Sequence, residues 1–267
     1  MKNRERLYDI ATMLFALTNV IAFFIFYIPS EVLYDAGTLR LISKYLIRFI
    51  EITMPPVAAM LLYLGGASEA WGASFLRGIP FAMPRMLYLI PYYFVYFTNR
   101  GYSETTIVPS AVGMGLIGAL VFFLQMMLLC KILRTSTRLT IKKSLKDDLP
   151  AMYRKSMPRE LKDMLDGKAA EQLREIPEKP GVFDFSAPVT VGIFSASFGQ
   201  FIISMLYEGF NALKYLVTQV GSYDLAEMLY ILSRFLFVII QLFVVHIICY
   251  GLKNKILKRG IKNENII

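Results

Sequence analysis

A few charged side chains lie inside or at the edge of long apolar stretches, and these residues are the best suited to chemistry in this chain. Arg48 and Glu51 come just before an apolar run, Glu208 lies near the end of a second run, and Arg234 lies inside a third. In a stretch that crosses a bilayer, each charge is costly unless it is paired, hydrated or able to reach the interface. Such residues are the first candidates for binding a charged solute or headgroup.

The length of the apolar stretch that ends at Leu64 indicates how deep its charged residues lie in the bilayer. Its uninterrupted apolar part is too short to span a bilayer, and counting back about twenty residues, the length of a transmembrane helix, places Tyr45 at the outer boundary. Arg48 and Glu51 then lie in the outer leaflet, one turn apart and able to pair. The Pro-Pro pair that follows predicts a kink or a local opening of this helix.

Two later stretches carry polar residues on one helical face, with spacings of three and four in the first and seven in the second. The first set is Ser197, Gln200, Ser204, Glu208 and Asn211, and the second set is Glu227, Arg234 and Gln241. Glu208 and Arg234 again fall in the outer half of their helices. Tyrosines of a further stretch complete the group, and the candidate substrate-binding residues are Arg48, Glu51, Tyr92, Gln200, Glu208 and Arg234.

Two interpretations of this group stand side by side. In the first, the residues line a polar cavity that opens to the exterior and suits a zwitterionic or anionic solute or a lipid headgroup. In the second, Arg48 and Arg234 extend to the interface and Glu51 neutralises Arg48. Small polar residues such as Gln200 then hold helices together, and Tyr92 belongs to the interfacial aromatic belt.

Apolar segments must position these residues. Of 267 residues, 56% are hydrophobic and 18% are charged, whereas soluble domains have about 45–50% apolar and about 25% charged residues. The segments do not alternate as barrel strands would. We predict an all-α, polytopic integral membrane protein with six transmembrane helices, at Leu7–Ile28, Tyr45–Leu64, Ile79–Thr98, Ile107–Leu133, Val189–Asn211 and Leu229–Leu252.

The second and sixth of these segments share a short pattern. Leu46-Ile47-Arg48-Phe49 matches Leu232-Ser233-Arg234-Phe235, and a glycine follows each arginine at the same interval. A parallel repeat would imply three successive helical hairpins. Most of the other matches are hydrophobic on hydrophobic, which any two spans provide, so chance similarity remains the simpler explanation.

Lysine and arginine gather in residues 2–6, 134–146 and 253–262, and six spans put all three clusters on one side. Since cytoplasmic loops are enriched in these residues, we predict a multi-pass protein of the cell membrane with both termini in the cytoplasm. The predicted organisation is helices one to four in 1–133, a cytoplasmic linker of short amphipathic helices in 134–187, helices five and six in 188–252, and a basic cytoplasmic tail in 253–267.

The sequence lacks the residues and motifs that several classes of function require. His246 is the only histidine, and Cys130 and Cys249 are far apart in the sequence, which disfavours metal sites and histidine-based triads. No phosphate-binding loop or dinucleotide fingerprint occurs. We therefore expect no catalytic residues, no metal and no cofactor. The net charge of +9 is explained by the positive-inside bias, so we expect no binding of nucleic acid.

These observations favour a small transporter, permease-like subunit or channel with a polar site in the outer half of the bundle. The alternative is a non-transporting accessory or sensory membrane protein that binds a partner through its cytoplasmic loop and tail. An enzyme that acts on lipid has the least support. The expected partners are the lipid bilayer, anionic lipid at the basic tail, and a cytoplasmic or membrane protein.

Overall fold

In a computed structural model the described residues are helical apart from short turns, and they contain no strand. Those residues are 12–21, 37–64, 71–148, 181–183, 185, 188–218 and 225–264. The helices are Thr12–Ile21, α3 (Gly37–Leu64), α4 (Trp71–Asn99), α5 (Glu104–Asp148), α7 (Pro188–Thr218) and α8 (Leu225–Glu264). The predicted all-α class is confirmed.

Within the described part of the chain, four helices are long and apolar enough to cross a membrane. Their apolar sections are Lys44–Tyr63, Glu104–Thr140, Val189–Thr218 and Met228–Asn254. Each reaches the roughly 20 residues that a hydrocarbon core requires. The chain is therefore a helical membrane protein in its coarse features, in agreement with the second, fourth, fifth and sixth predicted segments.

The other two predicted spans are not both long and apolar enough, in the described residues, to meet the same criterion for crossing a membrane. In α4, one arginine, three prolines and several tyrosines reduce the hydrophobicity of the predicted segment Ile79–Thr98. Of the predicted first segment, Leu7–Ile28, the structure describes the helix Thr12–Ile21, which is shorter than a span. The remainder of that segment lies outside the described residues.

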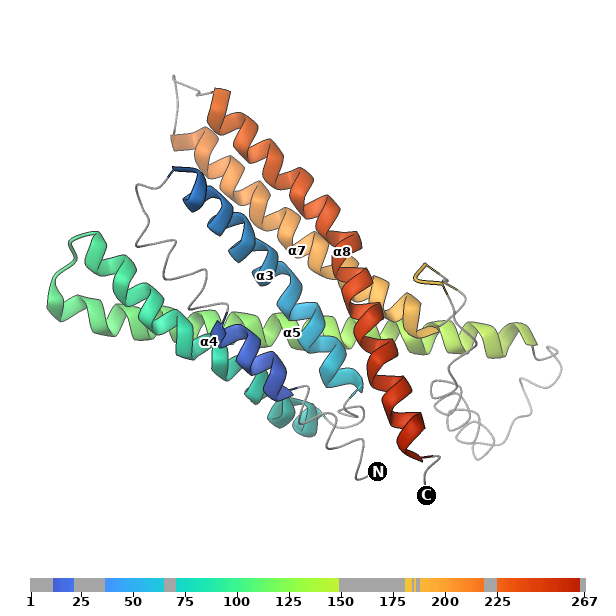
Figure 1. Cartoon of the computed structure of the whole chain (residues 1–267). Helices are drawn as coiled ribbons and strands as arrows, with labels where there is room; N and C mark the ends of the chain where they lie inside the picture. The colour runs from blue at the N-terminus through green and yellow to red at the C-terminus, as the bar shows by residue number, and fades with distance from the viewer. Residues whose placement is uncertain are drawn as a thin grey trace.

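The helices form two groups that cross each other (Figure 1). Helices α3, α7 and α8 run side by side, whereas α4 and α5 form an antiparallel hairpin that lies across them. The later part of α5 packs against α7, and α3 contacts α5, α7 and α8. Successive helix ends alternate between two ends of the bundle: α3 begins, α7 ends and α8 begins at one end, which is the upper end in Figure 1.

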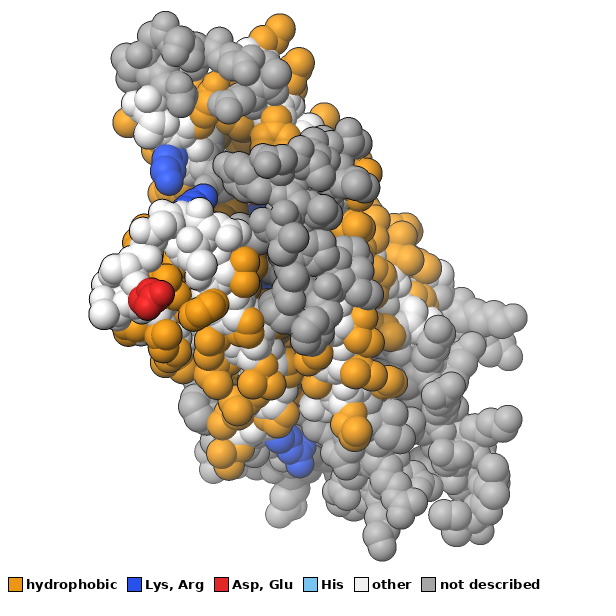
Figure 2. Space-filling model, turned by 60° about the vertical axis from the view of Figure 1, so that its left-hand side comes forward, with side chains coloured by type: hydrophobic (Ala, Val, Ile, Leu, Met, Phe, Trp, Pro, Cys, Tyr) orange, Lys and Arg blue, Asp and Glu red, His pale blue; other side chains and the backbone are white. Residues whose placement is uncertain are grey.

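The hydrophobic core lies where α3 crosses α5. Residues 57–62 of α3 are at most 8% exposed, and they belong to one cluster with Phe81 of α4 and with Phe122 and Met126 of α5. Phe15 of the Thr12–Ile21 helix packs edge-on against Phe81, with ring centroids 5.3 Å apart. On the outside, large hydrophobic side chains of α5, α7 and α8 are exposed, as a lipid-facing surface requires. Figure 2 shows hydrophobic side chains covering much of one face.

The two prolines in α3, Pro55 and Pro56, do not end the helix, which continues from Gly37 to Leu64. A proline lacks the backbone N–H and weakens the helical ladder around it. Gln241 of α8 contacts this part of α3: its amide nitrogen donates to the Phe49 carbonyl oxygen at 2.7 Å and to the Thr53 hydroxyl at 3.2 Å. A side chain from a neighbouring helix thus binds the α3 backbone in the turn before the carbonyls that the two prolines leave without a donor.

Two predicted boundaries fall within continuous helices. Helix α5 continues past Leu133 to Asp148, and α8 continues past Leu252 to Glu264. The predictions followed the loss of hydrophobicity, but residues 134–148 contain no glycine or proline, so nothing there interrupts helix propagation. The linker residues 149–180 lie outside the described part of the chain.

Glycines allow helices to approach closely, both within the α4–α5 hairpin and between α5 and α7. A β-carbon at Gly192 of α7 would meet the Thr137 hydroxyl and lie 2.9 Å from the Leu133 carbonyl oxygen, both on α5. A β-carbon at Gly115 of α5 would lie 3.3 Å from the backbone nitrogen of Ile90 on α4. The polypeptide backbone cannot yield as a flexible side chain can, so the contact at Gly192 requires glycine, and a side chain at Gly115 would need Ile90 to shift.

We therefore predict that Gly192→Ala destabilises the protein by about 1–3 kcal/mol, the usual cost of overpacking. Gly113→Ala is the control, because a β-carbon there meets no atom within 4 Å; alanine is the better helix former, so this variant should be neutral or stabilised by up to about 1 kcal/mol. Thermal unfolding of the purified protein in detergent measures both. Equal melting temperatures for the two variants would contradict the packing assigned to Gly192.

Candidate functional site: a buried carboxylate between two arginines

Glu208 is the centre of the candidate site. Its side chain is 2% exposed, and both carboxylate oxygens accept charged hydrogen bonds. Arg48 donates to Oε1 from Nη2 at 2.8 Å and from Nε at 3.0 Å, and Arg234 Nη2 lies 2.7 Å from Oε2. One carboxylate therefore joins three helices, since Arg48 is on α3, Glu208 on α7 and Arg234 on α8.

The network extends from α3 to the α4–α5 hairpin through Glu51. Arg48 Nη1 lies 3.5 Å from Glu51 Oε2, and Arg85 Nη2 of α4 lies 3.5 Å from Glu51 Oε1. The Arg85 guanidinium also lies over the Phe122 ring, 5.1 Å from its centroid. Five charged side chains thus connect α8, α7, α3 and α4 in an unbroken series.

Two neighbouring hollows open at this network. The inner hollow has a volume of about 270 Å³ and the outer hollow one of about 350 Å³, and both are lined by Tyr230 and Arg234. The inner hollow is further lined by Lys44, Tyr45, Ile47, Arg48, Glu51, Tyr207, Glu208 and Phe237. The outer hollow is further lined by Asn211, Lys214, Tyr215, Thr218 and Ile231.

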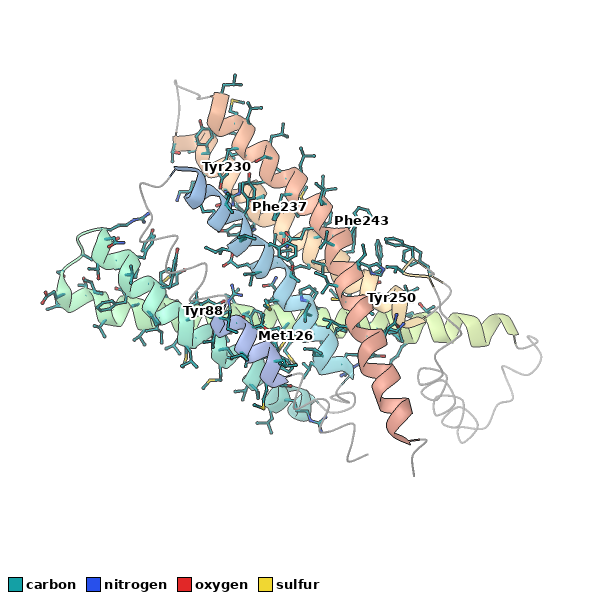
Figure 3. The ribbon with its side chains drawn as sticks, in the orientation of Figure 1. Tyr88, Met126, Tyr230, Phe237, Phe243 and Tyr250 are labelled. Atoms are coloured by element: carbon teal, nitrogen blue, oxygen red, sulfur yellow. The ribbon has the colours of Figure 1, made fainter. Side chains whose placement is uncertain are left out.

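Aromatic side chains form the walls of the inner hollow. The Arg48 guanidinium lies 4.4 Å from the centroid of the Tyr207 ring. Tyr45 packs edge-on against Tyr230 and Phe237, and its hydroxyl lies 2.6 Å from the Ser233 hydroxyl. Figure 3 shows Tyr230 and Phe237 at the same end of the bundle, on α8. This packing holds α3 against α8 beside the charges, and the guanidinium–ring contacts further orient the arginines.

The structure brings together four of the six predicted site residues: Arg48, Glu51, Glu208 and Arg234 are in direct contact with one another or through a shared partner. Gln200 lies deeper on the same face of α7. Its carbonyl oxygen accepts from Gln125 of α5 at 2.6 Å and its nitrogen donates to Ser204 at 3.2 Å, so it joins α7 to α5 and does not line either hollow.

Tyr92 likewise lies apart from the two hollows. It packs against Tyr93 and Tyr96 on α4, with ring centroids 5.1 and 6.2 Å away. It lines neither of them, and its aromatic neighbours follow from the tyrosine-rich sequence of its own helix. The grouping of Tyr92 with the charges stays a prediction.

Sequence reasoning missed Arg85 and Lys214. Arg85 stands in the middle of the predicted third segment, where any charge is costly, and that position was a sufficient signal. Lys214 lies three residues after Asn211, one helical turn further along α7, so the polar stripe could have been extended to it.

His246, the single histidine, lies in another environment. It is fully buried on α8, its Nε2 lies 2.8 Å from the Val182 carbonyl oxygen, and its ring stacks with Phe183 at a centroid distance of 5.4 Å. It anchors the segment that precedes α7. Among the described residues, no group of three or more histidine, cysteine, aspartate or glutamate side chains could hold a metal ion.

Comparisons with known proteins assign no family. No protein-family model matches the chain, and neither a curated protein nor a solved structure gives a match. The class that can be stated is that of a helical membrane protein, from its four apolar helices.

Because Glu208 neutralises two arginines in a buried position, we predict that Glu208→Gln destabilises the protein by about 3–5 kcal/mol, the cost of breaking a buried ion pair. The matched control is Glu104→Gln, an exposed glutamate at the start of α5, which should change stability little. Thermal unfolding in detergent provides the measurement. In the double variant Glu208→Gln/Arg234→Gln, the loss should be smaller than the sum of the two single losses. Strict additivity would show that the two residues do not interact.

Proposed function

We propose that this chain is a six-span membrane protein that binds a charged solute or headgroup in the hollows beside Glu208, and that it acts as a small transporter or permease-like subunit. The observation that carries the proposal is the ion-paired Glu208, 2% exposed, on the wall of an open hollow between otherwise apolar helices. A lipid-facing bundle has no general need for such a group, because lipid-exposed packing is served by apolar side chains.

The orientation of the arginines supports a binding role over simple anchoring at the interface. The Arg48 and Arg234 side chains are 19% and 23% exposed and both contact Glu208, whereas an anchoring arginine would extend its guanidinium to water. Buried ion pairs are poor stabilisers, because desolvation offsets most of the attraction. A functional requirement is therefore the better explanation for retaining this one.

The geometry of α4 supports it as a fifth span beside the four apolar helices, and the sixth span of the proposal is the predicted segment Leu7–Ile28. Helix α4 has 29 residues, about 43 Å of helix, which exceeds the roughly 30 Å hydrocarbon core. It packs antiparallel along the first half of α5, which is itself apolar enough to span. A helix paired in this way crosses the same layer as its partner. The distribution of basic residues then orients both termini toward the cytoplasm of a cell membrane.

A non-transporting sensory or accessory role is the second candidate, and one observation favours it. On the other side of the charges, residues 57–62 of α3 are packed into the core, with Ala58, Ala59 and Leu62 at 0% exposure. Transport would require α3 or α8 to move against α7 and open this packing. A receptor that binds its ligand without passing it on would require no such opening.

Labelling of single cysteines tests whether α4 crosses the membrane, as the six-span topology requires. We predict that Ser68→Cys, between α3 and α4, and Ser144→Cys, in the basic end of α5, react with an impermeant maleimide from the cytoplasmic side, and that Ser103→Cys, in the α4–α5 turn, reacts from the outside. The native Cys130 and Cys249 are 3% and 1% exposed and should give little background. Labelling of Ser68→Cys and Ser103→Cys from the same side would show that α4 does not cross.

Ligand binding and transport test the function itself. The wild-type protein, purified and reconstituted in vesicles, is screened with small anionic, zwitterionic and cationic solutes for thermal stabilisation and for uptake. We predict that Arg48→Gln lowers the affinity for the stabilising solute about tenfold or more, since a charge-assisted hydrogen bond is lost. Arg100→Gln is the control, because Arg100 is exposed at the end of α4 and lies over Tyr96. Binding without uptake would favour the sensory role, and equal affinities in both variants would contradict the site.

A further inference from the structure

We propose that the outer hollow is an oxyanion site, built to take a phosphate or carboxylate group between Lys214 and Arg234. The inference rests on the proposed function, because it names the class of ligand that would enter the same pair of hollows.

The lining of the outer hollow contains cations and hydrogen-bond donors but no carboxylate. Asn211, Lys214, Tyr215 and Thr218 recur three and four residues apart on α7, and they face Tyr230, Ile231 and Arg234 of α8. Taking both hollows together, four cations (Lys44, Arg48, Lys214 and Arg234) stand against two carboxylates (Glu51 and Glu208), an excess of two positive charges. An anion is the ligand that this excess favours.

The Arg234 guanidinium has more N–H groups than its ion pair with Glu208 uses. The guanidinium carries five N–H groups, and its one ion pair among the described residues is the contact from Nη2 to Glu208. Planar guanidinium groups bind carboxylate and phosphate through paired hydrogen bonds. Arg234 lines both hollows, so it can hold Glu208 on one side and an oxyanion on the other.

The two helix ends near this hollow act on an anion in opposite directions, so the side chains of Lys214 and Arg234 carry its attraction. The carbonyl oxygens of the last turn of α7 repel one, and the Thr218 hydroxyl shares its single hydrogen between those of Lys214 at 2.9 Å and of Tyr215 at 3.1 Å. Helix α8 begins nearby at Leu225, and the positive end of its dipole favours a negative group.

The shared arginine makes the site sensitive to the Glu208 network. An oxyanion that binds Arg234 competes with Glu208 for the same guanidinium charge. Removal of a carboxylate should therefore strengthen binding of an anion, whereas removal of the lysine should weaken it. A cationic ligand would show the opposite signs, so the pair of changes distinguishes the two classes of ligand.

The test measures binding of inorganic phosphate and of acetate to the full-length protein in nanodiscs of neutral lipid, by calorimetry at low ionic strength. We expect saturable binding, weakened about tenfold or more by Lys214→Gln, since one charge-assisted contact is lost. Lys131→Gln on α5, an exposed lysine away from both hollows, is the control and should bind as the wild type does. We expect Glu208→Gln to bind several-fold more tightly. Glu51→Gln, whose side chain is 28% exposed, is the second variant in case Glu208→Gln does not fold.

A second arm identifies the source of the oxyanion. If the protein binds soluble phosphate or acetate, the ligand is a free solute; if it binds only when phosphatidylglycerol replaces phosphatidylcholine in the nanodisc, and Lys214→Gln removes that difference, the ligand is a lipid headgroup. Either result supports the oxyanion site. The proposal is overturned by equal binding in Lys214→Gln and Lys131→Gln, or by tighter binding of choline or ammonium than of the anions. Anion binding without uptake would leave the site standing and contradict transport alone.

Discussion

The need to keep one buried carboxylate neutralised organises this end of the bundle. Glu208 is 2% exposed on α7. A buried carboxylate loses its hydration, and apolar side chains cannot replace it, so the charge must be paired. Arg48 of α3 and Arg234 of α8 approach it from neighbouring helices at 2.7–3.0 Å. Because three helices must meet at one group, their relative rotation at this level is determined within narrow limits. Glu51 then connects the α4–α5 hairpin to the same point through Arg85.

Polar contacts continue from Glu208 into the bundle in a way that joins helices. Ser204 and Gln200 follow on the same face of α7, and Gln125 completes the contact with α5. On α8, Gln241 lies two turns from Arg234 and binds the α3 backbone at Phe49, six residues before the proline pair. These neutral contacts are individually modest, at about 1 kcal/mol or less within a membrane. Their separation by depth is more informative: the charges surround the hollows, and the neutral amides lie within the packed region.

The positions of α3 and α8 give a physical meaning to their short sequence similarity. The two helices run in the same direction and contact each other, and each supplies one arginine to the same carboxylate, one to each oxygen. A shared requirement to reach Glu208 from both sides accounts for the matching arginines whether or not the two segments descend from one ancestor. The repeat therefore remains a hypothesis, and the pairing explains the pattern without it.

The sequence alone determined the helical class, four of the membrane-spanning stretches, and the common depth of Arg48, Glu51, Glu208 and Arg234, because hydrophobic length and helical periodicity specify how far along a helix and on which face a residue lies. It did not determine which faces meet. The crossing of the α4–α5 hairpin placed Arg85 against Glu51 and gave Gln200 a partner in Gln125, while Tyr92 stayed among its neighbours on α4. Nor did it determine the end of α5, because loss of hydrophobicity ends a membrane segment and not a helix. These outcomes depend on the rotation and crossing of packed helices, which only the tertiary structure decides.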